Sequence, residues 1–281
     1  MQMEGADILL RAGCPEPQPD ARELLFFAAG LDLSSYAANM NETVPEDAAD
    51  RFFSCIERRK MREPVQYITG RAYFFGYEFL VTPAVLIPRY DTEVSVEEAL
   101  RCVKASSAVL DLCTGSGCII LSIIKEAQKK FGKEFSVHGY ASDISKEALN
   151  VAKSNSKRFR IDVDFILSDL FDNIDGFYDI IISNPPYIPS ADISGLDPEV
   201  ADYEPHLALN GKQDGLFFYR KIVDAARRHL TCGGRLIMEI GYDQADSVTS
   251  LLCGAGYTDI RCLRDLAGRD RSVSAKWVQM E

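Results

Sequence analysis

The chain has 281 residues, of which 47% are hydrophobic and 26% charged, so it is long enough to bury a sizeable core and has the composition of a globular protein. Its formal net charge of −11 argues against a protein whose affinity depends on nucleic-acid phosphates, and it favours a basic partner. No apolar run approaches membrane-spanning length, and the acidic first twenty residues are unlike a secretory or transit peptide, so we expect a cytoplasmic protein without a membrane segment.

Eight cysteines are scattered along the chain without a C-x-x-C pair or a His/Cys cluster at zinc spacing. We interpret them as reduced core residues and expect no metal site. Cys113 and Cys118 flank a glycine loop, where packing of small residues is favoured over a redox role. The densest basic cluster, at positions 58–62, closes a predicted helix. We interpret it as a solvated helix end rather than a contact with RNA or a partner.

Residues 1–72 are predicted to be helical. Asp20 and Glu23 have the spacing of a capping box ahead of an apolar run, and Gly30 is available to end that helix. The segment 43–46 repeats the signal before a second helix. From residue 73 to 88 the pattern changes to aromatic and β-branched residues around glycine and proline, which predicts a hairpin linker and a domain boundary.

After about residue 106 strands and helices alternate, which predicts an α/β domain over residues 89–281 with a doubly wound, mostly parallel sheet. Strands are predicted at 109–112, 135–141, 163–167, 178–183, 235–240, 257–263 and 272–278, and helices at 119–130, from 145, at 215–230 and at 244–253.

The apolar strand 178–183 leads into Asn184-Pro185-Pro186-Tyr187. Two consecutive prolines cannot continue a strand ladder, so this tetrapeptide is expected at the carboxyl end of the strand, where open α/β sheets bind ligands. The side-chain carbonyl of Asn184 and the backbone carbonyl of Pro185 can accept both hydrogens of a substrate NH2 group while Tyr187 packs on its flat face. This arrangement would aim the nitrogen lone pair at an electrophile, which predicts methyl transfer to a base amine or a protein amide. The alternative is a proline-rich turn that only ends the strand.

The first strand of the α/β domain leads into a glycine loop, Asp111-Leu112-Cys113-Thr114-Gly115-Ser116-Gly117. Its glycines let the backbone turn tightly and approach a ligand closely. A dinucleotide fingerprint would require a small residue where Ile120 stands, which argues against NAD and FAD. Asp111 is placed to meet a cationic amino group or to orient the loop by a hydrogen bond, and the two roles are compatible.

Two further strand ends offer carboxylates. Asp143 ends the second strand, where it can accept both hydroxyls of a ribose; capping the next helix is the alternative, but Ser145 is better placed for it. Asp169 and Leu170 follow the third strand and suit the amino edge and the faces of an adenine.

Motifs spread along nearly the whole chain form one ensemble, at 63–70, 75–79, 85–89 with Glu93, 111–117, 184–187, 197–200, 203–205, 214–216, 219–220, 239–241, 265–268 and 270–271. On these motifs the chain resembles the HemK/PrmC family, the protein-(glutamine-N5) methyltransferases that modify peptide chain release factors. The resemblance implies a class I S-adenosylmethionine-dependent methyltransferase domain with a seven-stranded sheet. It also implies an N-terminal helical domain over 1–72 that docks the release factor, and a hairpin linker over 73–88.

The resemblance also assigns roles by position. Thr114, Gly115 and Gly117 would line the methionine part of the cofactor, Asp143 its ribose, and Asp169 with Leu170 its adenine, while Asn184, Pro185 and Tyr187 would hold the substrate glutamine. The complete candidate cofactor site is Asp111, Cys113, Thr114, Gly115, Ser116, Gly117, Asp143, Asp169, Leu170 and Asn184, and the candidate catalytic segment is Asn184, Pro185, Pro186 and Tyr187.

The chain departs from the family pattern at Cys113, at Tyr90-Asp91 and at Leu170, which leaves the stacking of the adenine open. Arg89 and Glu93 either border the pocket from the linker or form an internal ion pair.

The function implied is transfer of a methyl group from S-adenosylmethionine to the side-chain amide nitrogen of glutamine in the Gly-Gly-Gln motif of a release factor, by a monomer that needs no metal. The leading alternative is a nucleic-acid amine methyltransferase acting on a flipped adenine or guanine, against which the net charge argues. A third reading is a cofactor-binding module without catalysis.

Overall fold

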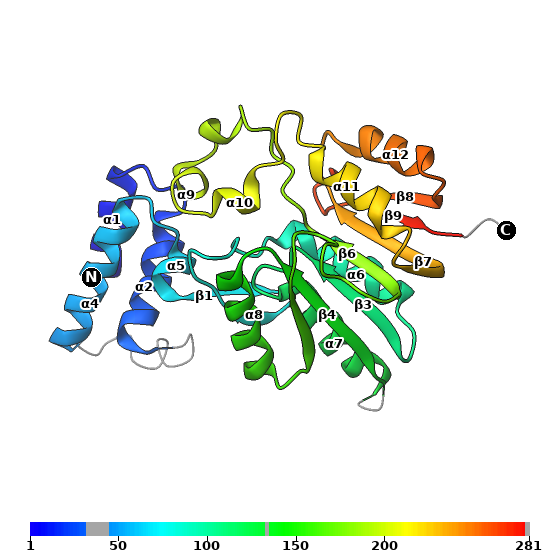
Figure 1. The fold of residues 1–281 in the computed structure, drawn as a ribbon. Coiled ribbons are helices and arrows are strands. Elements are labelled where there is room, and N and C mark those ends of the chain that lie inside the picture. Colours follow the sequence, from blue (N-terminus) through cyan, green and yellow to red (C-terminus); the bar gives the residue numbers. More distant parts are fainter. Residues whose placement is uncertain (32–44, 133–134, 279–281) are drawn as a thin grey trace. The chain divides into compact units, whose positions relative to one another are not determined.

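The computed structural model describes residues 1–31, 45–132 and 135–278. The chain divides into two units (Figure 1). The first, here called the helical unit, comprises Met1–Arg71 together with Asp197–Tyr203, and the second, here called the sheet unit, comprises Ala72–Leu196 and Glu204–Glu281. The inclusion of Asp197–Tyr203 in the helical unit was not predicted from the sequence.

Five helices make up the described part of the helical unit: α1 (Gln2–Arg11), α2 (Pro17–Ala29), α4 (Glu46–Lys60), α5 (Val65–Thr69) and α9 (Pro198–Ala201). Their apolar faces meet in a core that includes Leu9, Leu24, Phe52 and Ile56. The burial of these side chains stabilises helices that would be marginal in isolation.

The predicted capping box at Asp20 is wrong. Helix α2 begins one turn earlier, because Pro17 occupies its first position, where a missing N–H costs nothing. Asp20 therefore lies in the first turn and binds Arg59 instead of capping. The predicted end at Gly30 is correct, since that glycine adopts the left-handed conformation. The predicted cap at Thr43 lies outside the described residues.

The solvated helix end expected at positions 58–62 is also wrong for Arg59. Its side chain is only 4% exposed and lies between two carboxylates, with Nε 2.7 Å from Asp20 and Nη2 2.8 Å from Glu199. Arg62 forms a second ion pair with Glu199, at 2.5 Å. These contacts fix α9 against the end of α4, and they are supported by the Tyr203 hydroxyl, which donates to the Met61 carbonyl at 2.6 Å.

The sheet unit begins with the predicted hairpin, β1 (Arg71–Phe74) and β2 (Tyr77–Leu80), followed by an extended connector, the short helix η1 (Tyr90–Thr92) and α6 (Glu93–Cys102). The connector supplies residues to the site described below.

Seven strands then form one sheet in the order β5-β4-β3-β6-β7-β9-β8. The strands are β3 (Ser107–Leu112), β4 (Val137–Asp143), β5 (Val163–Leu167), β6 (Tyr178–Ser183), β7 (Leu230–Glu239), β8 (Thr258–Arg264) and β9 (Asp270–Lys276). The first five in the order pair in parallel, and β9 pairs antiparallel with both β7 and β8. The predicted fold class is confirmed.

Helices cover both faces of this sheet (Figure 1). Helices α7 (Cys118–Phe131) and α8 (Lys146–Phe159) lie on one face with α6, and α11 (Phe217–Ala226) and α12 (Ala245–Gly254) on the other; η2 (Ile193–Gly195) and α10 (His206–Leu209) are short. Alternate residues of β6 serve opposite layers, because Ile180 and Ile182 belong to one core and Ile181 to the other. This explains why the strand is apolar throughout.

Two expectations for this unit need correction. The helix predicted over 215–230 ends at Ala226, because Leu230 already pairs with Tyr178 as the start of β7. All eight cysteines are free, but three of them, Cys232, Cys253 and Cys262, are exposed and not part of the core. Among the described residues, no helix is both long and apolar enough to span a bilayer.

Candidate active site

The predicted site residues gather at one edge of the sheet. The glycine loop follows β3, Asp143 ends β4, Asp169 lies two residues beyond β5, and Asn184 follows β6. Because β3, β4, β5 and β6 run parallel, their carboxyl ends meet at the same edge. Strand order reverses between β3 and β6, and such a switch point opens a crevice for a ligand.

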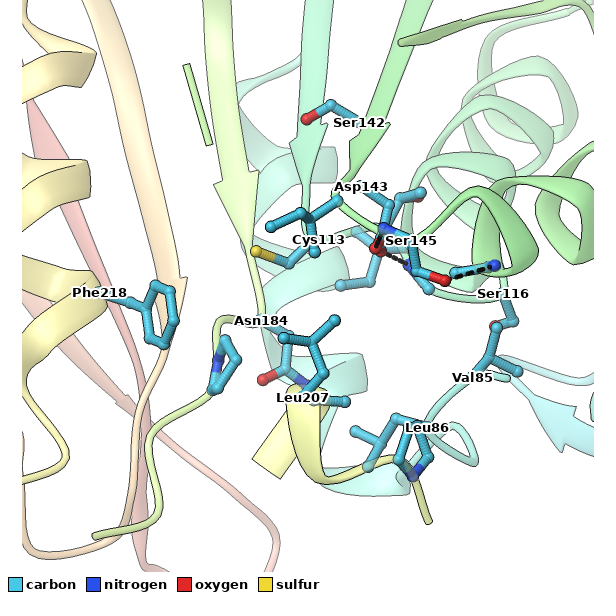
Figure 2. Close-up of a pocket in the computed structure, with 18 of the residues that line it drawn as sticks. Val85, Leu86, Cys113, Ser116, Ser142, Asp143, Ser145, Asn184, Leu207 and Phe218 are labelled. Carbon is cyan, nitrogen blue, oxygen red and sulfur yellow. Dashed lines mark hydrogen bonds between the residues drawn. The ribbon is translucent and has the colours of Figure 1, made fainter. Parts of the chain in front are cut away.

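A pocket of about 390 Å³ lies at this edge. Its wall includes nine predicted residues: Cys113, Thr114, Gly115, Ser116, Asp143, Asp169, Leu170, Asn184 and Pro186. The other four, Asp111, Gly117, Pro185 and Tyr187, are not among the residues that line it. Figure 2 shows Asn184 between Phe218 on one side of the pocket and Val85 with Leu86 on the other.

Asp111 is fully buried beneath the glycine loop and accepts a 2.6 Å hydrogen bond from the Thr114 hydroxyl through Oδ2. Its Oδ1 has no partner of good geometry among the described residues. Burial raises the pKa of Asp111 to about 7, although the Thr114 hydroxyl and the Ile120 amide oppose the rise. These contacts match the loop-orienting role, and contact of the carboxyl with a ligand stays a prediction.

Asp143 joins the glycine loop to the next helix. One carboxylate oxygen accepts the Gly115 amide and the other the Ser145 amide, both at 2.9 Å. Ser145 is the side-chain cap of α8, as predicted, since its hydroxyl accepts the Ala148 amide at 3.1 Å. Burial raises the pKa of Asp143, while hydrogen bonds from backbone amides lower it. Each oxygen keeps a lone pair with which the carboxylate can accept a hydroxyl from the pocket.

The Asn184–Tyr187 loop is fixed by contacts on both sides. Before it, the Ser183 hydroxyl donates to the Leu112 carbonyl at 2.9 Å, which ties β6 to β3. After it, the Tyr187 carbonyl accepts the Gln244 amide at 3.0 Å. The Asn184 Nδ2 lies 3.4 Å from the Thr92 hydroxyl, which leaves Asn184 Oδ1 as the acceptor for the pocket.

The Tyr187 side chain is not among those that line the pocket, and its packing on the substrate stays a prediction. Its hydroxyl donates to Glu239 at 3.3 Å, and burial raises its pKa. Aromatic rings at the pocket wall come from Phe217 and Phe218 of α11, and Leu207 of α10 also lines the pocket; Figure 2 labels Phe218 and Leu207. None of these three was predicted, and the only sequence signal was their nearness to motifs at 203–205 and 219–220.

The alternative roles of Arg89 and Glu93 are now distinguishable. Arg89 lines the pocket and binds the buried Glu204 at 2.5 Å. Glu93 accepts the Phe75 amide at 2.6 Å, so its carboxylate fastens α6 to the hairpin. The Arg89 ion pair is thus made with a residue that follows the Asp197–Tyr203 segment and not with Glu93.

The fold and the strand-end pocket define a methyltransferase domain. A family model described as the methyltransferase small domain matches residues 96–195. The crystal structure of a methyltransferase from Pyrococcus furiosus has the same fold, with a TM-score of 0.52 and 18% identity over 73% of this chain and 91% of that chain.

The particular family follows from relatives that match almost the entire chain. The model of the PrmC N-terminal domain matches residues 1–70. The release factor glutamine methyltransferase of Geobacter sulfurreducens is 39% identical, over 95% of this chain and 92% of its own. That of Cereibacter sphaeroides is 40% identical, over 95% and 94%. The chain therefore belongs to the family of release factor glutamine methyltransferases, as the sequence motifs indicated.

Proposed function

We propose that this enzyme transfers a methyl group from S-adenosylmethionine to the side-chain amide nitrogen of the glutamine in the Gly-Gly-Gln motif of a peptide chain release factor. The observation that supports this most directly is the orientation of Asn184. Its NH2 group faces Thr92, so its carbonyl oxygen is left to accept a hydrogen from an NH2 group in the pocket. The family membership supports a glutamine amide as that NH2 group.

The residues at the pocket wall fit S-adenosylmethionine. A Cβ at Gly115 would project into open space, so a ligand can approach the backbone there. Asp143 would bind the ribose hydroxyls, Thr114 and Gly115 the methionine part, and Asp169 with Leu170 the adenine. When bound, S-adenosylmethionine supplies a methyl group on a positively charged sulfur, which is the electrophile of the reaction.

The protein's contribution is orientation. An amide nitrogen is a poor nucleophile because its lone pair is delocalised, and acceptors on both hydrogens favour a pyramidal nitrogen with a directed lone pair. Asn184 Oδ1 and the Pro185 carbonyl would be these acceptors. The apolar side chains of Val85, Leu207 and Phe218 would keep water from the reacting atoms.

The test is to incubate the enzyme with labelled S-adenosylmethionine and, separately, release factor, a basic protein, tRNA and DNA, and to map the label by mass spectrometry. Label on the glutamine of the release factor is expected. Label found only on nucleic acid would support the rival amine methyltransferase and end the proposal.

An internal check is Asn184→Ala. Because it removes one acceptor for the amide, we expect kcat/KM to fall by about 100-fold or more, with little change in cofactor affinity. Asn150→Ala, on the exposed side of α8, is the matched control and is expected to behave like the wild type. Undiminished turnover of Asn184→Ala would contradict the role of Asn184.

A further inference from the structure

Glu239 is a buried carboxylate next to the proposed substrate loop that the reaction described above does not use. It is the last residue of β7, and the residue before it, Met238, pairs with Ser183 of β6. Only 2% of Glu239 is exposed. Its carboxyl contacts Tyr187 of the Asn184–Tyr187 loop but does not line the pocket.

Two hydroxyl groups face this carboxylate. The Tyr187 hydroxyl donates to Oε1 at 3.3 Å. The Thr92 hydroxyl is the second, because hydrogen bonding from Thr92 lowers the pKa of Glu239. Oε2 has no hydrogen-bond partner of good geometry among the described residues, so its lone pairs remain available to accept a hydrogen. The Tyr187 contact is long, and hydrogen bonds in catalytic sites commonly tighten when the substrate is bound.

The direction of these hydrogen bonds determines the direction of Asn184. A threonine hydroxyl has one hydrogen, and if that hydrogen points to Glu239, only lone pairs remain for Asn184. Those lone pairs accept the Asn184 NH2 group, which lies 3.4 Å away. If the Asn184 amide were flipped, its NH2 group would face the substrate NH2 group. Both groups are donors in that arrangement, so no hydrogen bond would form between them.

We propose that Glu239 is a positioning residue for methyl transfer, which holds Tyr187 directly and, through Thr92, orients Asn184 so that its carbonyl oxygen faces the substrate amide. This inference rests on the proposed function, because the substrate amide is the group that the oriented Asn184 would hold. It adds Thr92 and Glu239 to the residues on which the reaction depends.

The ionised form of Glu239 is required, because a protonated carboxyl has a hydrogen of its own and competes with the two hydroxyl donors. The pKa of Glu239 is raised to about 7, mainly by burial and to a smaller extent by Asp91. Thr92, Arg271 and Tyr187 oppose the rise. The charged and titratable groups that act on it are Asp91 of η1, Cys118 of α7, Tyr187 after β6, Tyr219 of α11 and Arg271 of β9. Methyl transfer should therefore increase as the pH rises through about 7.

The experiment measures kcat and KM for release factor at saturating S-adenosylmethionine between about pH 6 and pH 8.5, together with cofactor affinity. The variants are Glu239→Gln, Thr92→Val, their combination and Thr92→Ser. Glu126→Gln is the matched control, since it also removes a carboxylate that accepts a tyrosine hydroxyl, that of Tyr77, at a place outside the pocket wall.

We expect Glu239→Gln and Thr92→Val each to lower kcat by about 10- to 100-fold at pH 8, because misplacement of an orienting group is costly. The pH profile of Glu239→Gln should be flat through neutrality. The kcat of the double variant should be little lower than that of either single variant, because both changes interrupt the same chain of contacts from Glu239 through Thr92 to Asn184. Thr92→Ser keeps the hydroxyl and should retain most activity, and cofactor affinity should change by less than about threefold in all variants.

Three results would overturn the proposal. In the first, Glu239→Gln retains the rate and the pH profile of the wild type while the wild type methylates glutamine. In the second, the losses of the two single variants multiply in the double variant. In the third, Thr92→Ser is as inactive as Thr92→Val, which would assign Thr92 to packing. If the wild type places no label on glutamine, the proposed function fails, and the positioning role fails with it.

Discussion

Asp111 is a single buried carboxyl group whose ionisation should affect the stability of the whole sheet unit. Its pKa is raised from 3.8 to about 7, chiefly by burial, so the folded protein binds a proton more tightly than the unfolded chain does. The resulting stabilisation is complete below the unfolded pKa and is lost as the pH rises through about 7. In Asp111→Asn the side chain at this position cannot ionise, so the variant should not lose stability in this way as the pH rises. Its amide oxygen can still accept the Thr114 hydroxyl.

We therefore expect the free energy of unfolding of the wild type to fall, relative to Asp111→Asn, by up to about 1.4 kcal/mol per pH unit between about pH 5 and pH 7. Urea unfolding at several pH values measures the difference. Glu239 is present in both proteins, so the effect of its ionisation cancels in the difference. Asp164→Asn, an exposed residue of β5, is the control that should run parallel to the wild type. Parallel curves for Asp111→Asn would show that Asp111 does not titrate in this range.

The difference between predictable and unpredictable site residues is visible at this scale. Asp143 and Asn184 could be predicted because each directly ends or follows an apolar strand, and the carboxyl end of a parallel strand is where ligands bind. Thr92 and Glu239 could not be assigned a role, because their proposed effect depends on an interaction between residues 147 positions apart that no local pattern records. The contact of the Tyr187 hydroxyl with Glu239, 52 positions further along the chain, was not predicted for the same reason.

At the scale of elements, the Asn184–Tyr187 loop depends on a glycine in the following segment. A Cβ on Gly211 would lie 2.7 Å from both the Cα and the carbonyl carbon of Tyr187, a distance that real side chains do not show. Neither atom belongs to a flexible side chain, so the loop itself would have to move. Ile188 also donates to Leu209 at 3.0 Å, which holds the two segments at this distance.

We expect Gly211→Ala to lower kcat for release factor by about 10-fold or more through displacement of the loop, with a smaller change in cofactor affinity. Gly195→Ala is a suitable control, because a Cβ there meets nothing within 4 Å. The two variants are compared by steady-state kinetics and by binding of S-adenosylmethionine. Wild-type kinetics for Gly211→Ala would show that the loop tolerates the displacement.

Element boundaries were predictable where a local chemical signal decided them. The prolines after Ser183 end β6, and Ser145 caps α8, as expected. The start of α2 was misplaced because Pro17 provides a stronger signal than Asp20. The end of α11 was misplaced because strand pairing of Leu230 with Tyr178, which lies 52 residues earlier in the chain, terminates the helical pattern. Tertiary pairing overrides amphipathic periodicity in that case.

At the scale of the whole molecule, the chain passes through the helical unit twice. It leaves the sheet unit at Leu196, forms Asp197–Tyr203 within the helical unit and returns at Glu204, the partner of Arg89 at the pocket wall. The alternation of elements predicted the sheet but gave no sign of this second passage. It depends on ion pairs between residues that are 137 and 140 positions apart, which periodicity and motifs do not reveal.

The passage should depend on Glu199, which accepts both Arg59 and Arg62. Partial burial raises the pKa of Glu199, but hydrogen bonds from the two arginines outweigh this and lower it overall, so the residue is held as an anion. Glu199→Ala would leave the nearly buried Arg59 with Asp20 as its remaining ion-pair partner among the described residues, at a cost of about 1–3 kcal/mol in local stability.

We expect the backbone amides of 197–203 to exchange hydrogen faster in Glu199→Ala, because the segment opens more often, while amides of β3 and β6 keep their protection. Hydrogen exchange with mass spectrometry measures both regions in the full chain. Asp202→Ala, an exposed carboxylate of the same segment, is the matched control and should leave exchange unchanged. Equal exchange in all three proteins would mean that helix packing alone holds the segment. Faster exchange restricted to Glu199→Ala would show that two ion pairs secure the second passage of the chain through the helical unit.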